Sequence, residues 1–127
     1  MSEVELQHYR RRLLDLKRRH GAILTDLEEE ALRPIGAEIA GELSEVPVHP
    51  ADLAPAEYEE EVTLGLLVNE AHLLNEINDA LARIEQGSFG RCVECGQTIS
   101  RRRLHAIPYA RHCLRCAKRV QEATRST

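Results

Sequence analysis

Residues 92–116 read CVECGQTISRRRLHAIPYARHCLRC and hold all the cysteines of the chain, in two C-x2-C pairs separated by seventeen residues. Two residues between paired cysteines allow both sulfur atoms to reach one ion from a tight turn. Two such turns supply the four thiolates of a closed tetrahedral shell. The spacing therefore predicts one structural zinc ion bound by Cys92, Cys95, Cys113 and Cys116.

Other uses of these cysteines fit the sequence less well. Two-residue disulfide loops are strained, and the chain starts Met1-Ser2-Glu3 without the basic and then apolar leader of a secreted protein. A redox dithiol would need a βαβ context, which the pattern does not predict. His112 is next to Cys113 and could replace one sulfur, although four cysteines already close the shell. Because a closed shell leaves no position for substrate, the zinc is expected to be structural.

Two apolar seams precede the cysteines. Their residues recur at spacings of three and four, which is typical of helices that pack along one stripe. The first seam contains Leu6, Tyr9, Leu13, Leu16, His20, Ile23 and Leu27, and the second contains Leu67, Leu74, Ile77, Leu81 and Ile84. Glu70 interrupts the second seam as His20 interrupts the first. We interpret His20 as a polar residue that sets the register of paired helices, rather than as a metal or switch site.

The two seams predict a mainly α fold. Pro47, Pro50 and Pro55 lie between them, so this connection cannot be regular helix throughout. The simplest arrangement is an antiparallel coiled-coil helical hairpin over residues 1–87 with its tip near 44–56. Residues 88–127 are expected to form a small four-cysteine (C4) zinc finger and a C-terminal helix. The apolar runs are too short to cross a bilayer, so a cytoplasmic protein without a membrane partner is expected.

Charge is divided unevenly along the chain. Residues 1–87 carry 8 basic and 19 acidic side chains, whereas residues 88–127 carry 9 basic and 2 acidic ones. Such an asymmetry indicates a polyanionic partner or two contact surfaces of opposite sign, although single exposed charges are commonly just solvated. The candidate basic surface comprises Arg101, Arg102, Arg103, Arg111 and Arg115.

The cysteine region resembles a known family. The matching residues are Phe89-Gly90-x-Cys92-x-x-Cys95-Gly96, Ile99, Arg103-Leu104, Ala106-x-Pro108 and Cys113-x-x-Cys116, and the run from Leu81 to Gly90 is similar to the family's junction between helix and finger. This pattern resembles the DksA/TraR C4 zinc-finger family. The resemblance implies a transcription regulator that inserts its hairpin into the secondary channel of RNA polymerase, where acidic tip residues approach the catalytic Mg²⁺.

The predicted tip differs from the best-known family pattern, Asp-x-x-Asp-x-Ala. Asp52 and Ala54 match the second aspartate and the alanine, but His49 stands at the first position. This stretch is more like the stress-protein branch of the family. Members also bind guanosine tetraphosphate through basic residues on the second helix, and between Val62 and Ile84 this chain has only Arg83. A response to that nucleotide is therefore not expected.

Three functions are compatible with these features. The first is the regulator of RNA polymerase implied by the resemblance. The second is direct binding of nucleic acid by the basic finger, which would weaken steeply with salt. The third is a zinc-stabilised adaptor for another protein. An enzyme is not expected, because the sequence shows no nucleophile with a base and no glycine-rich phosphate loop.

Overall fold

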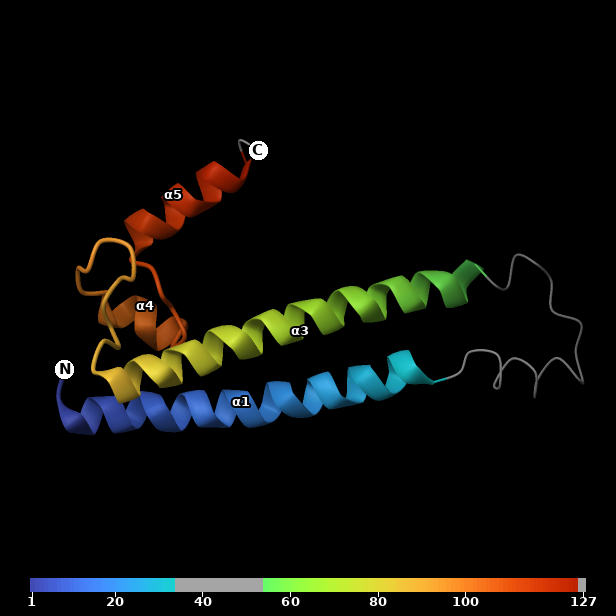
Figure 1. The fold of residues 1–127 in the computed structure, drawn as a ribbon, viewed down its shortest axis with the longest axis horizontal. Coiled ribbons are helices and arrows are strands. Elements are labelled where there is room, and N and C mark those ends of the chain that lie inside the picture. Colours follow the sequence, from blue (N-terminus) through green and yellow to red (C-terminus); the bar gives the residue numbers. More distant parts are fainter. Residues whose placement is uncertain (34–53, 126–127) are drawn as a thin grey trace, which may run out of the picture. The chain divides into compact units, whose positions relative to one another are not determined.

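The computed structural model describes residues 1–33 and 54–125 of the chain (Figure 1). Its helices are α1 (Glu3–Leu32), α3 (Ala54–Gln86), α4 (Arg101–Ala106) and α5 (Leu114–Arg125). These ranges contain no strand, only an isolated antiparallel bridge between Arg91 and Thr98. None of the helices in these ranges is long and apolar enough to span a membrane. The mainly α fold predicted from the two seams is confirmed.

Local signals in the sequence set the helix ends. At the start of α1, the Ser2 hydroxyl accepts a hydrogen bond from the amide of Glu5 at 3.2 Å, as an N-cap does. At the end of α3, Gly87 has a φ of 79°, and the amide of Ser88 donates to the carbonyl of Arg83 at 2.9 Å. This left-handed glycine closes the helix in a Schellman motif.

The second helix begins earlier than expected. The three prolines predict a tip near residues 44–56 that is not regular helix throughout, whereas α3 starts at Ala54 and includes Pro55. Proline is tolerated in the first turn of a helix, where its missing amide hydrogen would have no intrahelical acceptor. The rest of the predicted tip, including His49 and Asp52, lies outside the described residues.

The chain divides into two compact units. Unit 1 comprises residues 1–19 and 73–127, and unit 2 comprises residues 20–72. The contacts of unit 1 join the first part of α1, the last part of α3 and the cysteine region. The predicted boundary between residues 87 and 88 divides the chain once along the sequence, whereas unit 1 combines two separate segments. That boundary stays a prediction.

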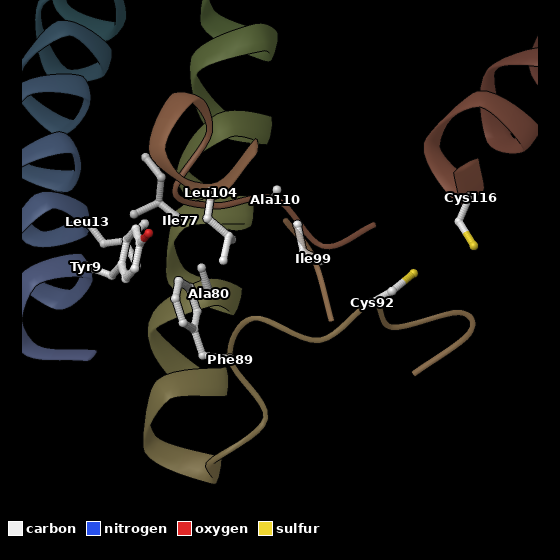
Figure 2. Close-up of a cluster of buried hydrophobic side chains, with 10 residues drawn as sticks. All are labelled: Tyr9, Leu13, Ile77, Ala80, Phe89, Cys92, Ile99, Leu104, Ala110 and Cys116. Atoms are coloured by element: carbon white, nitrogen blue, oxygen red, sulfur yellow. The ribbon is translucent and has the colours of Figure 1, made fainter. Parts of the chain in front are cut away.

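Unit 1 has a continuous apolar core (Figure 2). Leu13 of α1 and Ile77 of α3 are fully buried, so the two helices pair antiparallel here. The rings of Tyr9 and Phe89 lie 5.4 Å apart between centroids. Leu104 of α4 packs into the same cluster, which places the cysteine region directly on the paired helices. The buried members are Tyr9, Leu13, Ile77, Ala80, Phe89, Cys92, Ile99, Leu104, Ala110 and Cys116.

Unit 2 also pairs α1 with α3, but through a polar contact. His20 Nδ1 and Glu70 Oε2 are 2.7 Å apart, and both side chains are largely buried. Nearby apolar side chains such as Ile23 and Leu66 remain more than two-fifths exposed. Among the described residues of this unit, the helix pair has no third layer covering it.

Candidate metal centre

The four cysteine sulfur atoms converge on one point. All four Sγ atoms lie within 4.8 Å of one another, and Cys95 Sγ is 3.8 Å from Cys113 Sγ. In Figure 2 the sulfur atoms of Cys92 and Cys116 point toward each other from separate segments. A tetrahedral ion with zinc–sulfur bonds of about 2.3 Å would hold its ligands about 3.8 Å apart. The cluster therefore has the dimensions and the donor set of a structural zinc site.

A tight turn presents the first cysteine pair. The amide of Gly96 donates to the carbonyl of Cys92 at 2.9 Å, and Gly96 has a φ of 74°. Glycine adopts this left-handed conformation without steric cost, which explains why it follows the pair. The amide of Cys92 in turn donates to the carbonyl of Gln97 at 2.8 Å. These bonds fix both sulfur atoms on the same side of the turn.

The second pair stands at the start of α5. Cys113 directly precedes the helix, and its carbonyl accepts a hydrogen bond from the amide of Ala117 at 2.9 Å. Cys116 lies in the first turn, where the positive end of the helix dipole favours a thiolate. The amide of Val93 donates to the carbonyl of Arg111 at 2.9 Å, which ties the two cysteine segments together.

The surroundings of the cysteine cluster shift the pKa values of three of its thiols. Burial would raise the pKa of Cys92, but hydrogen bonds from the backbone amides of Cys95, Cys113 and Glu94 bring it down to about 6. The amide of Cys116 lowers the pKa of Cys113. Sharing a hydrogen bond with Cys113 raises the pKa of Cys116 to about 12, and burial adds to this effect. A divalent ion would displace the remaining protons, because zinc binds thiolates.

A small apolar layer supports the site. The hydroxyl of Ser100 caps α4 by accepting from the amide of Arg103 at 3.2 Å, and this orients Leu104 into the core. Ile99 and Leu104 are 1% and 0% exposed. Both side chains link the cysteine turns to Leu13 and Ile77 of the paired helices.

The predicted basic surface is partly used within the protein. Arg101 pairs with Glu5 at 3.2 Å, and Arg111 pairs with Asp79 at 2.9 Å. Arg103 Nε donates to the carbonyl of His112 at 2.9 Å. Arg102 and Arg115 are exposed and have no ion pair within the described ranges. A charge count along the sequence could not distinguish the paired from the unpaired arginines, because their partners are distant in the chain.

His112 and the predicted tip residues do not belong to the cysteine cluster. The ring of His112 lies beside Glu94, with 3.8 Å between Nε2 and Oε1. Among the described residues, the side chains that cluster as potential metal ligands are the four cysteines, without His112. The predicted tip residues are not brought to this site: Ala54 is the first residue of α3, while His49 and Asp52 lie in the segment without described structure.

The contact between His20 and Glu70 was not predicted, although both residues were recognised as interruptions. A signal was present in the spacing. His20 lies one heptad after Leu13, and Glu70 lies one heptad before Ile77. In an antiparallel pair with Leu13 opposite Ile77, one heptad step brings the two polar residues together. The seams alone define the faces of the helices but not this register.

Comparison with known proteins places the chain in a family. The family of prokaryotic dksA/traR C4-type zinc fingers matches residues 87–122. An uncharacterized protein of Aquifex aeolicus is 41% identical over 81 residues, which cover 64% of this chain and 56% of that protein. The RNA polymerase-binding transcription factor DksA of Escherichia coli K12 is 33% identical over 116 residues, or 91% of this chain and 71% of that factor.

A solved structure supports the same family assignment. The transcription factor DksA2 from Pseudomonas aeruginosa superposes with a TM-score of 0.74 at 30% identity, covering 98% of this chain and 89% of that one. The similarity extends through both the helical and the cysteine regions. The chain belongs to the DksA/TraR family of C4-type zinc-finger proteins, and its cofactor is one structural zinc ion.

Proposed function

We propose that this chain regulates transcription by binding RNA polymerase. The observation that carries the proposal is the similarity to the RNA polymerase-binding transcription factor DksA, which extends over 91% of the chain rather than over the cysteine region alone. The similarity therefore includes both the helix pair and the finger.

The role proposed for zinc is to fix the base of the hairpin. With Cys92, Cys95, Cys113 and Cys116 as ligands, the ion holds the segment that carries Ile99 and Leu104 against the paired helices. The chemistry that zinc supplies is a closed, rigid cross-link of four thiolates. Such a cross-link leaves no open position on the metal for a substrate, so the role proposed for the zinc is structural, and the activity proposed for the protein is binding rather than catalysis.

The hairpin tip is proposed as the functional centre. By resemblance to the family, the hairpin enters the secondary channel of the polymerase, and Asp52 and Ala54 approach the catalytic Mg²⁺. A carboxylate near a bound Mg²⁺ changes the local field, whereas an amide of the same shape does not carry that charge. His49 replaces one carboxylate of the common pattern, which leaves Asp52 as the acidic group. This function places the protein in the cytoplasm with its polymerase.

The test is a pull-down with purified RNA polymerase, followed by transcription in vitro. We expect the zinc-loaded chain to bind the enzyme, and Asp52→Asn to bind it with nearly the same affinity while its effect on transcription disappears. His49→Asp is the matched variant at the tip and should strengthen the effect. No retention on the polymerase, with zinc content normal, would refute the proposal.

Direct binding of nucleic acid is the second candidate, favoured by the exposed Arg102 and Arg115. Three of the five predicted basic residues already have partners inside the protein, which reduces the charge available for phosphates. If Asp52→Asn retained full activity while Arg102→Glu with Arg115→Glu abolished it, nucleic acid would replace RNA polymerase as the proposed partner.

A further inference from the structure

Two glycines lie inside the long helices of unit 2. Gly21 belongs to α1 and Gly65 to α3. Neither has the positive φ that Gly87, Gly90 and Gly96 adopt. A Cβ atom added to Gly21 or Gly65 would meet nothing within 4 Å beyond its chain neighbours and the backbone of its own helix. Alanine would therefore fit at both positions, and it would strengthen both helices because glycine favours the unfolded chain.

The two glycines lie at nearly the same level of the helix pair. His20 of α1 contacts Glu70 of α3. Because the helices are antiparallel, each step forward along α1 matches a step back along α3, and five steps from this contact Thr25 is level with Gly65. Gly21 and Thr25 are four residues apart, which is about 6 Å along the helix axis. Both glycines therefore weaken the pair within about one helical turn.

A side-chain hydrogen bond weakens the same turn of α1. The hydroxyl of Thr25 donates to the carbonyl of Gly21 at 3.0 Å. In a regular helix this carbonyl accepts from the amide of Thr25, so the hydroxyl competes for it. Such bonding to the fourth residue before a threonine slightly destabilises a helix and often bends it. It falls here on a residue without a side chain.

Closer contacts stand on both sides of this level. On one side His20 and Glu70 are largely buried and 2.7 Å apart. On the other side Thr63 of α3 is buried. Between them Ile23 and Leu66 are more than two-fifths exposed. The weak level is therefore a short stretch between better packed ones, and not simply the frayed end of the two helices.

We propose that Gly21, Gly65 and the hydrogen bond of Thr25 form a flexible joint in the helix pair. At this joint the two helices open and bend together, while the core around Leu13 and Ile77 stays closed. The joint allows the helices beyond it to adapt to a surface without loss of that core. Its use by a hairpin that enters RNA polymerase rests on the proposed function, whereas the joint itself does not.

The test is amide hydrogen exchange, followed by NMR on the zinc-loaded full chain. Protection along α3 should pass through a minimum at Leu67 and rise again at Thr63. Exchange at Leu67 should depend little on low concentrations of urea, because a local opening exposes little surface, whereas exchange at Ile77 should accelerate steeply. Gly21→Ala and Gly65→Ala should each slow exchange at Leu67 roughly fivefold, since alanine makes the helix harder to open by about that factor.

Asn75→Ala is the matched control. Asn75 is exposed on the part of α3 that belongs to unit 1, and alanine strengthens the helix there as well. This substitution should slow exchange at Ile77 about threefold and leave exchange at Leu67 unchanged, because the joint opens without unfolding the helix at Asn75. If Leu67 exchanged only through unfolding of the whole chain, both amides would slow equally. Zinc content shows that each variant keeps its finger.

Four outcomes would overturn the proposal. Protection that falls steadily from Leu74 to Thr63 would mean that the helix frays from its end. Unchanged exchange at Leu67 in either alanine variant would mean that the two glycines do not act together. Equal slowing of Leu67 and Ile77 in Asn75→Ala, or a steep dependence of Leu67 on urea, would mean that no local opening occurs. The measurement contains no polymerase, so these outcomes leave the proposed transcriptional function unchanged.

Discussion

The two units use the same pair of helices but stabilise it in different ways. In unit 1 the seam residues Leu13 and Ile77 are completely buried, whereas in unit 2 the corresponding positions hold His20 and Glu70, with side chains 24% and 19% exposed. The sequence periodicity is similar in both units. The difference arises because the finger adds a third layer over unit 1, and the depth of burial follows this layer rather than the seam.

The covered core of unit 1 is where we expect most of the stability of the protein to lie. Leu104 and Ile99 cover the unit 1 helices, and the cysteine turns hold both residues in position. Few other apolar groups are available in this region, so we expect its packing to depend on the metal. Unit 2 depends instead on contacts between its two helices.

The largest expected effect is that of zinc removal. Structural zinc supplies about 10–16 kcal/mol of apparent binding free energy in small fingers. We expect Cys95→Ser, or a strong chelator, to release the metal and to move the NMR signals of Ile99 and Leu104 from their folded positions to random-coil positions. Elemental analysis and the amide spectrum measure both effects in the same sample.

The control for this experiment comes from the same Cys95→Ser protein, and it is the set of NMR signals from unit 2. The helical signals around His20 and Glu70 should change much less than those of the finger. Metal-free protein that keeps its Leu104 and Ile99 signals would show that the finger folds without zinc.

A smaller effect is expected from truncation of the seam. Leu13→Ala removes a fully buried side chain and should lower the free energy of unfolding by about 2–5 kcal/mol. Ile23→Ala makes a related change at a seam position that is 42% exposed, and should cost about 1 kcal/mol or less. Urea unfolding followed by circular dichroism gives both values. Equal losses would contradict the difference between the units.

The polar contact of unit 2 should be worth about 1 kcal/mol. Glu70→Gln weakens a part-buried hydrogen bond at 2.7 Å, and a net loss of about 0.5–1.5 kcal/mol is typical of such a bond. Replacing both His20 and Glu70 by leucine should be nearly neutral or stabilising, because no polar group is left without its partner. A double-mutant cycle in urea measures the coupling, and a coupling near zero would show that the contact is incidental.

The smallest effect is expected at the surface. Arg18 forms an exposed ion pair with Asp15 at 2.6 Å, and Arg18→Ala should change the free energy of unfolding by less than about 0.5 kcal/mol. The same urea experiment measures this change. A loss comparable to that of Leu13→Ala would mean that Arg18 does more than pair with Asp15.

The sequence predicted the parts of this molecule that are encoded locally. Cysteine spacing predicts the zinc site, because ligands two residues apart can reach one ion. The three-and-four spacing predicts the paired helices, because it follows the helical turn. The pairing of His20 with Glu70 was missed because it needs a register, and the partners of Arg101 and Arg111 were missed because Glu5 and Asp79 approach them only in the folded chain.

The division of unit 1 between two distant segments has a consequence for synthesis on the ribosome. Tyr9 and Leu13 emerge early, but their partners around Ile77, Phe89 and Leu104 follow only after half of the chain or more has been added. Contacts between such distant residues form slowly, because a long loop must close first. The nascent α1 therefore displays its apolar stripe until the cysteine turns leave the exit tunnel. The supply of zinc at that moment decides how long this exposed, aggregation-prone stage lasts.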